Sequence, residues 1–160
     1  MTSREALQEA AGALSRAGSP SPRLDAEILL AHCLGKDRLF LFTDPHHCLK
    51  GDEIDCYRRL IHRRLDSEPI AYLIGRKPFW SLVLDVDRRV LIPRPETELL
   101  VEEVLKILAS SGNVTPDIID VGTGSGAIGL ALAASLPRAR LTATDLSPDA
   151  LAVARGNAEK

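Results

Sequence analysis

The hydrophobic pattern of the chain changes after Gly75. Before this residue, apolar side chains recur every three or four positions, as in helices with one buried face. Thr2 and Glu5 have the spacing of a capping box, which predicts a first helix directly after Thr2. Pro22 favours the first turn of a second helix, and Asp52 is the expected N-cap of a later one. This part of the chain is therefore predicted to form a small helical bundle.

Beyond Gly75 the apolar residues are spaced as in strands and helices that alternate. Residues 78–86 alternate apolar and polar side chains, which predicts a β-hairpin with its turn around Ser81. Residues 95–109 follow with the pattern of an amphipathic helix. The residues expected to face inward on this helix are Leu99, Leu100, Val104, Leu105 and Leu108.

The last part of the chain contains apolar segments of strand and helix length in turn. Residues 117–121 and 141–144 are expected strands, and residues 127–136 are an expected helix between them. Ser147 and the proline after it predict the start of a final helix. This order is typical of an α/β fold, in which right-handed crossovers connect parallel strands.

Composition narrows the classes of function. The 160 residues carry a net charge of −2, so the chain as a whole is attracted to neither nucleic acid nor membrane surfaces. Its longest apolar runs fall far short of the roughly 20 residues of a membrane-spanning helix. An odd number of cysteines without a CxxC pair argues against a disulfide framework and fits a reducing compartment. We therefore expect a monomeric cytoplasmic protein that does not bind membranes or nucleic acid directly.

The cysteines and histidines do not form a recognisable metal site. A structural zinc site needs closely spaced pairs of ligands, and no such pair is evident in this sequence. Buried cysteines and loop histidines explain the set better than a metal does, so no metal is expected. The residues considered are His32, Cys33, His46, His47, Cys48, Cys56 and His62.

A glycine-rich turn follows the strand at 117–121. Such a turn brings backbone N–H groups close to a small ligand, and Asp145, at the end of the next strand, is placed to accept hydrogen bonds from ribose hydroxyls. The turn predicts a nucleoside-containing cofactor. The alternatives are glycines that serve only close packing and an Asp145 that stabilises a helix N-terminus. The residues of the turn are Gly122, Thr123, Gly124, Ser125 and Gly126.

Asp120 bears on the choice between two cofactor classes. The turn also satisfies a relaxed dinucleotide fingerprint, so an NAD-dependent oxidoreductase stays possible. A dinucleotide brings a pyrophosphate, which a carboxylate two residues before the first glycine would repel. S-adenosylmethionine has no phosphate and carries two cationic groups, a sulfonium and an ammonium. The sequence therefore favours S-adenosylmethionine, with Asp120 near its positive charges.

Three segments of the second half resemble the HemK-type N5-glutamine methyltransferases of peptide chain release factors. They read Pro-Phe-Trp-Ser-Leu at 78–82, Leu-Ile-Pro-Arg-Pro-Glu-Thr-Glu at 91–98, and Ile-Asp-Val-Gly-Thr-Gly-Ser-Gly-Ala-Ile-Gly-Leu at 119–130. Residues 24–30 and 63–75 are similar to the N-terminal domain of the same family. The resemblance spans nearly the whole chain, and the segment at 91–98 is far more specific than the glycine turn.

The resemblance implies an architecture and a set of roles. Residues 1–75 would be a helical, substrate-recognising domain, 76–94 a β-hairpin linker, and 95–160 the first part of a Rossmann-like methyltransferase domain. The cofactor implied is S-adenosylmethionine, and the partner is a class-1 release factor, methylated on the glutamine of its Gly-Gly-Gln motif. Residues implied beside the cofactor are Arg94, Pro95, Glu96 and Thr97. Phe79 is implied near the substrate glutamine, although a place in the hairpin core would explain it as well.

The same resemblance leaves one motif unmatched. The family carries an Asn-Pro-Pro-Tyr motif that binds the target amide, and this string does not occur in the sequence. We therefore expect no methyl transfer by these 160 residues alone and suspect that the chain is part of a longer protein. A non-catalytic fragment that binds a cofactor or a partner is a further alternative.

A basic band on the helix before residue 65 admits two interpretations. It consists of Arg58, Arg59, His62, Arg63 and Arg64. A solvated helix face explains the band most simply, because acidic residues lie nearby. The alternative is a docking surface for the release factor.

Overall fold

The chain divides into two compact units, Met1–Ile74 and Gly75–Lys160. A computed structural model describes residues 1–112 and 114–160 of the protein. The boundary between the units lies where the hydrophobic pattern changes. The hairpin expected as a linker at 76–94 belongs to the second unit. It does so because its apolar residues Phe79 and Leu84 are buried in the same core as the helices that follow.

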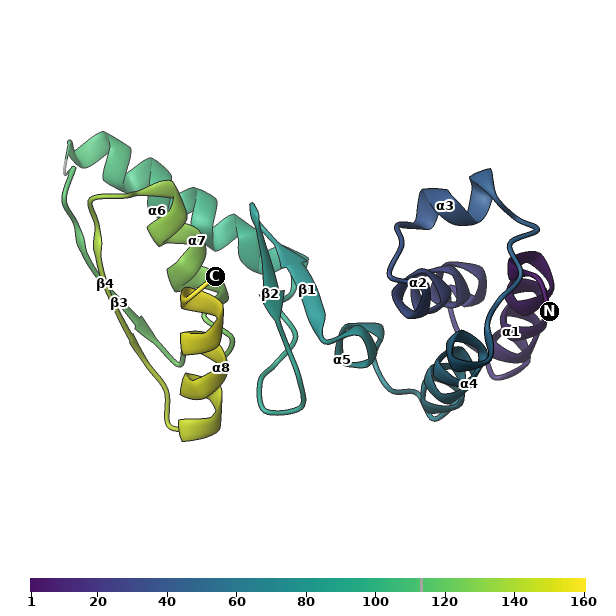
Figure 1. Ribbon diagram of the computed structural model, residues 1–160. Coiled ribbons are helices and arrows are strands. Elements are labelled where there is room, and N and C mark those ends of the chain that lie inside the picture. Colours follow the sequence, from purple (N-terminus) through teal and green to yellow (C-terminus); the bar gives the residue numbers. More distant parts are fainter. Residues whose placement is uncertain (113) are drawn as a thin grey trace. The chain divides into compact units, whose positions relative to one another are not determined.

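The first unit is helical, as the apolar spacing predicts. Its helices are α1 (Ser3–Arg16), α2 (Pro22–Leu34), α3 (Arg38–Thr43), α4 (Gly51–Leu65) and α5 (Ile70–Ile74) (Figure 1). The predicted capping box is present, since the Thr2 N–H donates to Glu5 Oε2 over 2.8 Å and the Glu5 N–H donates to Thr2 Oγ1 over 3.3 Å. Gly35 ends α2 in the left-handed conformation that a helix C-terminus favours.

The expectation that Asp52 caps α4 is wrong. Lys50 holds the N-cap position, and Asp52 lies in the first turn of the helix. The physical reason is a hydrogen bond of 2.7 Å from the Lys50 N–H to Glu53 Oε2, which satisfies the backbone two residues earlier than expected. Asp52 still suits its position, because an acidic residue in the first turn interacts favourably with the helix dipole.

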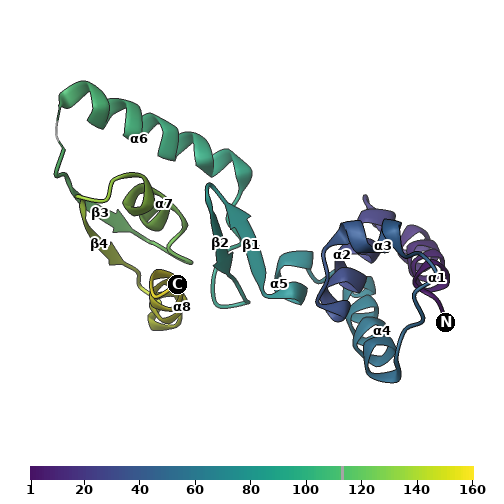
Figure 2. The ribbon, with the colours of Figure 1, turned by 45° about the horizontal axis from the view of Figure 1, so that its top comes forward.

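The core of the first unit lies between α1, α2 and α4. Helix α2 contacts both α1 and α4 (Figure 2). Its residues Leu29 and Leu30 are completely buried. Tyr57 of α4 is also buried, and its hydroxyl donates to the Ala26 carbonyl of α2 over 3.2 Å. This bond satisfies a polar group that burial would otherwise leave unpaired.

The second unit contains a hairpin, a parallel strand pair and three longer helices. Its elements are β1 (Arg76–Phe79), β2 (Leu82–Asp85), η1 (Pro95–Thr97), α6 (Glu98–Ser111), β3 (Asp117–Val121), α7 (Ala127–Ser135), β4 (Arg140–Thr144) and α8 (Pro148–Ala158). Strands β1 and β2 are antiparallel, with Phe79 opposite Leu82, and β3 and β4 are parallel, with Asp117 opposite Arg140. The predicted α/β fold is therefore confirmed.

Helix α6 buries a different set of residues from the one expected. Leu99 and Leu100 are 62% and 50% exposed, so the prediction that they face inward is wrong. Val101 is completely buried, and Val104 and Leu105 are partly buried in the same core. The buried stripe is therefore centred on Val101, with the i+3 and i+4 spacing of one helix face, and Leu99 and Leu100 lie beside it.

The strand pair β3–β4 has one covered face. Helix α7 contacts both strands and lies on one side of them (Figure 1). Along β3, Ile118 and Asp120 are half-buried, whereas Ile119 and Val121 are 69% and 80% exposed. Because side chains alternate between the faces of a strand, Ile118 and Asp120 lie on the covered side. This alternation places the Asp120 carboxylate beneath α7.

Candidate functional site

The glycine turn lies where strand β3 ends. The N–H groups of Gly122 and Thr123 both donate to the Thr144 carbonyl, over 2.8 and 2.9 Å, which fixes the turn to the end of β4. Gly122, Gly124 and Gly126 have φ angles of 79°, 55° and 84°. Glycine adopts this region at no steric cost, whereas other residues are strained there. The residue types at these positions therefore follow from the backbone path.

Two of the glycines leave the backbone accessible. A Cβ atom built at Gly122 or Gly124 would have no atom within 4 Å, so open space adjoins the turn there. A Cβ at Gly126 would instead lie 2.9 Å from Cδ1 of Leu130. Gly122 and Gly124 thus suit the approach of a ligand, and Gly126 is required for the close packing of the turn on α7.

The two other residues of the turn are buried. Thr123 and Ser125 are 7% and 3% exposed. The Thr123 hydroxyl donates to Asp120 Oδ2 over 2.7 Å, and the Ser125 carbonyl accepts a hydrogen bond of 2.9 Å from the side-chain amide of Asn157. Both residues therefore fix the turn to its neighbours through hydrogen bonds, Thr123 to β3 and Ser125 to α8. Their expected role beside a cofactor stays a prediction.

Asp120 connects the strand, the turn and helix α7. Its Oδ2 atom accepts from the Thr123 hydroxyl and, over 3.1 Å, from the N–H of Gly129 near the start of α7. The same oxygen lies 3.0 Å from a Cβ built at Gly129, so a larger residue there would have to displace it slightly. Asp120 thus has a structural role that the sequence did not indicate. Its contact with the positive groups of a cofactor stays a prediction.

Asp145 lies beside the turn, one residue after the end of β4. Its Oδ2 accepts from the Gly124 N–H and its Oδ1 from the Ser147 N–H, both over 2.9 Å. These bonds, first the one from Ser147 and then the one from Gly124, hold the pKa of the Asp145 carboxyl below its ordinary value. The carboxylate is half-exposed and ionised at neutral pH. It can therefore accept further hydrogen bonds from a ligand.

The Asp145 carboxylate and the accessible backbone of the glycine turn fit the nucleoside part of S-adenosylmethionine. An ionised carboxylate accepts from two neighbouring hydroxyls, which is the arrangement of a ribose. It lies within hydrogen-bond distance of Gly124, whose backbone borders open space. A small ligand can thus contact the turn and the acid together. The structure thus places Asp145 beside the glycine turn, and their common role in binding a cofactor stays a prediction.

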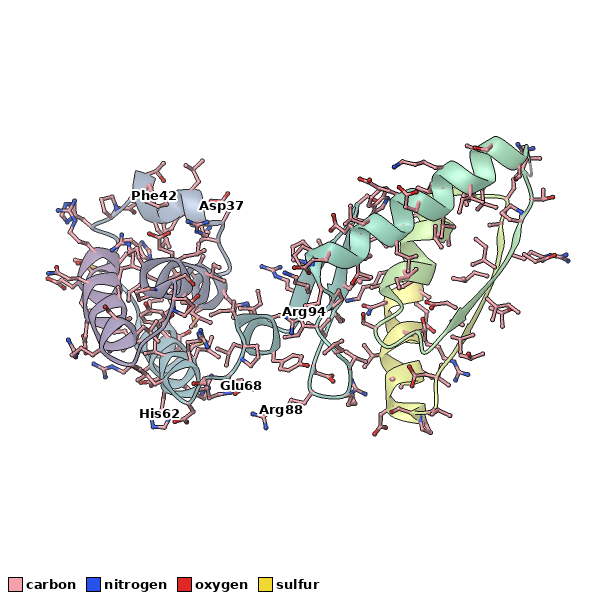
Figure 3. The ribbon with its side chains drawn as sticks, turned by 180° about the vertical axis from the view of Figure 1, so that it is seen from behind. Asp37, Phe42, His62, Glu68, Arg88 and Arg94 are labelled. Atoms are coloured by element: carbon pink, nitrogen blue, oxygen red, sulfur yellow. The ribbon has the colours of Figure 1, made fainter. Side chains whose placement is uncertain are left out.

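Residues 94–97 form a separate, exposed part of the predicted site. Arg94 precedes the 3₁₀ turn η1, where the Thr97 N–H donates to the Arg94 carbonyl over 3.0 Å (Figure 3). Arg94, Pro95 and Glu96 are exposed, and Thr97 is half-buried. Among the residues that the structure describes, no hydrogen bond joins this turn to the glycine turn. Their role beside the cofactor stays a prediction.

Phe79 lies in the core of the second unit. It is 1% exposed and belongs to the cluster that contains Leu84 and Val101. The hairpin-core explanation that the sequence left open therefore accounts for Phe79 in this structure. A role near the substrate glutamine stays a prediction.

Sequence reasoning missed two residues that connect the hairpin to the rest of the unit. Glu98 Oε1 accepts from the Trp80 N–H over 2.9 Å, at the hairpin turn where Trp80 has a φ angle of 55°. The Asn157 side chain accepts from the Asp85 N–H over 2.7 Å and donates to the Asp85 carbonyl over 3.0 Å. Glu98 gives a weak signal, as the last residue of the family-like segment at 91–98. Asn157 gives none, because its partners are distant in sequence.

The basic band on α4 is partly neutralised within the first unit. Arg63 makes a two-pronged ion pair with Glu68, and Arg64 pairs with the buried Asp25 over 2.9 Å. Arg58, Arg59 and His62 are exposed, and Figure 3 labels His62 and Glu68. Two of the five basic residues therefore serve the fold.

The described residues also bear on metals and membranes. No group of three or more potential metal ligands is found in residues 1–112 and 114–160. Over the same residues, every helix is too short or too polar to cross a membrane.

Comparison with known proteins assigns both units. Residues 5–75 match the PrmC N-terminal domain, and residues 95–160 match the methyltransferase small domain. The chain is 49% identical over 141 residues to a release factor glutamine methyltransferase of Chlorobaculum tepidum, which covers 86% of this chain and 48% of the relative. It is 44% identical over all 160 residues to the proteins of that name in Koribacter versatilis and Vibrio cholerae, covering 56% and 55% of them.

These matches agree with the arrangement of the two units. The chain spans about half the length of the curated relatives it matches. The helical unit coincides with the first match, and the parallel strand pair with its glycine turn lies within the second. The chain therefore belongs to the family of release factor glutamine methyltransferases, of which it carries the N-terminal domain and the start of the methyltransferase domain.

Proposed function

We propose that this chain is part of an enzyme that transfers a methyl group from S-adenosylmethionine to a release factor. The acceptor is the side-chain nitrogen of the glutamine in the Gly-Gly-Gln motif of class-1 release factors, and the reaction takes place in the cytoplasm. The observation that carries this proposal is the identity of 44% over all 160 residues to proteins named release factor glutamine methyltransferase.

The geometry of the second unit supports a role in cofactor binding. The glycine turn presents accessible backbone at Gly122 and Gly124, and Asp145 adds an ionised carboxylate beside them. In this proposal Asp145 accepts hydrogen bonds from the ribose hydroxyls, and the turn contacts the methionine part. Asp120 and residues 94–97 complete the cofactor site. Phe79 contributes to the region that receives the glutamine.

Methyl transfer needs groups that bind the cofactor and groups that orient the glutamine amide, and the residues named above provide only the first. S-adenosylmethionine supplies an electrophilic methyl group on a positively charged sulfur. An amide nitrogen is a poor nucleophile, because its lone pair is delocalised into the carbonyl. The enzyme must therefore orient the glutamine amide and accept hydrogen bonds from it. The Asn-Pro-Pro-Tyr motif that would do so is not in this sequence, so we propose that the 160 residues bind the cofactor without transferring methyl.

Titration calorimetry on the 160-residue chain tests the cofactor proposal. We expect S-adenosylmethionine to bind and NAD to give no heat of binding. Asp145→Ala should weaken binding at least tenfold, since each lost charge-assisted hydrogen bond is worth roughly 1.5–3 kcal/mol. Asp149→Ala removes an exposed acid from the first turn of α8 and should leave the affinity within twofold. Binding of NAD alone would favour the oxidoreductase alternative, and binding of neither would favour a non-catalytic fragment.

A second experiment addresses transfer itself. The chain is incubated with a class-1 release factor and S-adenosylmethionine that is labelled in its methyl group. We expect no label in the release factor. Label on its Gly-Gly-Gln glutamine would contradict the proposal that these residues alone are inactive, while leaving the substrate assignment intact.

A further inference from the structure

Two cysteines of the first unit lie against each other across a helix pair. The Sγ atoms of Cys33, on α2, and Cys56, on α4, are 2.7 Å apart. The two residues are 23 positions apart in the sequence, and packing of α2 on α4 brings them together. Both thiols are free, and both residues are half-buried, so small reagents can reach them.

The surroundings of the pair restrict what its thiols can do. Among the described residues, no third metal-ligating side chain joins them. The third cysteine, Cys48, is exposed and separate from the pair. The helices that carry the pair are fixed by buried contacts, including the Tyr57 hydroxyl bond to Ala26. The backbones that carry the two thiols are therefore held close to each other.

We propose that Cys33 and Cys56 form a reversible oxidation site, in which hydrogen peroxide converts the two thiols into a disulfide between α2 and α4. One thiolate attacks a peroxide oxygen, the O–O bond breaks, and hydroxide leaves, so that sulfur becomes a sulfenic acid. The second thiol attacks that sulfur, the S–S bond forms, and water is released. Two thiols lose two electrons and two protons in all, and one peroxide becomes two waters. Thiol reductants reverse the change.

Burial affects the reaction of the pair with peroxide. Burial and then the neighbouring Cys56 thiol raise the pKa of Cys33, which keeps Cys33 protonated at neutral pH. Peroxide reacts with the thiolate, so we expect the disulfide to form faster as the pH rises.

The test uses the full chain with Cys48→Ser, which prevents bridging between molecules through the exposed thiol. We expect peroxide treatment to abolish both remaining thiols and dithiothreitol to restore them. Peptide mapping should show Cys33 joined to Cys56 within one molecule. The melting temperature of the helical unit, followed by circular dichroism, should rise on the order of 10 °C on oxidation, because the bond constrains the unfolded chain.

Single variants test the need for both thiols. With Cys33→Ser or Cys56→Ser added, no disulfide can form within the unit, and dimedone should trap a sulfenic acid on the cysteine of the pair that remains. Two results would overturn the proposal of an oxidation site: thiols that persist under excess peroxide, or separate oxidation of each cysteine to a sulfinic acid without a bridge. Circular dichroism of the reduced variants shows whether they are folded.

Discussion

Gly126 connects the glycine turn to helix α7, and its backbone allows hardly any other residue. Its φ angle is 84°, in the region where a Cβ atom is strained. The position also lacks space, since a Cβ would lie 2.9 Å from Cδ1 of Leu130 and 3.5 Å from Cβ of Ala154. Conformation and packing therefore both require glycine here, whereas at Gly122 conformation alone does.

We predict that Gly126→Ala destabilises the second unit by about 2 kcal/mol. The strained backbone contributes roughly 1–2 kcal/mol, and displacement of Leu130 adds to it. Urea unfolding followed by the fluorescence of Trp80, the one tryptophan of the chain, measures the change.

Gly156→Ala is the matched control. Gly156 lies within α8, and a Cβ there would meet no atom within 4 Å. This change should stabilise the unit by about 0.5–1 kcal/mol, because alanine favours a helix over glycine. Equal effects of the two substitutions would show that neither strain nor packing at Gly126 matters.

The glycine turn illustrates what a single sequence can reveal about individual residues. Glycines beside an acid at the end of the next strand predict a turn and its partner, because the pattern is local and the geometry recurrent. The pairing of Asp120 with Gly129 was not predicted. A carboxylate suggests a ligand as readily as a backbone partner, and only the burial of Asp120 beneath α7 reveals its use within the fold.

At the scale of elements, helix α8 connects the hairpin to the glycine turn through one side chain. Asn157 is 8% exposed and bonds to both backbone groups of Asp85 and to the Ser125 carbonyl. An amide supplies the one acceptor and the donors that this arrangement needs. The contact joins segments 72 residues apart in sequence, so no local pattern could have predicted it.

We predict that Asn157→Ala costs the second unit roughly 2 kcal/mol, because it leaves the buried Ser125 carbonyl and the part-buried backbone groups of Asp85 without this partner. Asn157→Asp should cost at least as much, since a carboxylate would face the Asp85 and Ser125 carbonyls without a donor. Glu159→Ala changes an exposed residue two positions after Asn157 and should alter the stability by less than about 0.5 kcal/mol. Trp80 fluorescence in urea measures all three, and a harmless Asn157→Asp would contradict the assigned hydrogen bonds.

Element boundaries were predicted more accurately than element faces. Strand β3 and the cap of α8 by Ser147 agree with the sequence, because apolar runs and capping residues mark ends directly. The inward face of α6 was wrong at Leu99 and Leu100, since a helix rich in apolar residues offers more than one possible stripe. Which stripe is buried depends on helix α7 and on the hairpin residues Phe79 and Leu84, which share a core with Val101.

At the scale of the whole molecule, the chain consists of two units with unequal cores. The first unit buries large apolar residues from several of its helices, among them Leu7, Leu14, Leu29 and Leu30. The second exposes apolar side chains on its strand pair and beyond β4, such as Ile119, Val121 and Leu146. Exposed apolar surface adds nothing to stability, so the first unit should be the more stable.

We predict two separate unfolding transitions in urea. Trp80 reports the second unit, and far-ultraviolet circular dichroism reports both, so the fluorescence midpoint should precede the main loss of helical signal. Leu29→Ala, at a completely buried position of the first unit, should lower only the later transition, by about 2–5 kcal/mol. Coincident midpoints by both probes would contradict independent units.

The sequence separations of the hydrogen bonds in the second unit predict the order in which its parts fold. The bond from Gly124 to Asp145 spans 21 residues, and that from Gly129 to Asp120 spans 9, whereas the hairpin reaches Asn157 across 72. Contacts close in sequence form fastest, because less chain entropy is lost in closing them. During folding, the strand pair, its turn and Asp145 should thus be assembled before the hairpin docks on Asn157 of α8. The geometry of the glycine turn is then an early product of folding, and the contact of the hairpin with α8 consolidates it.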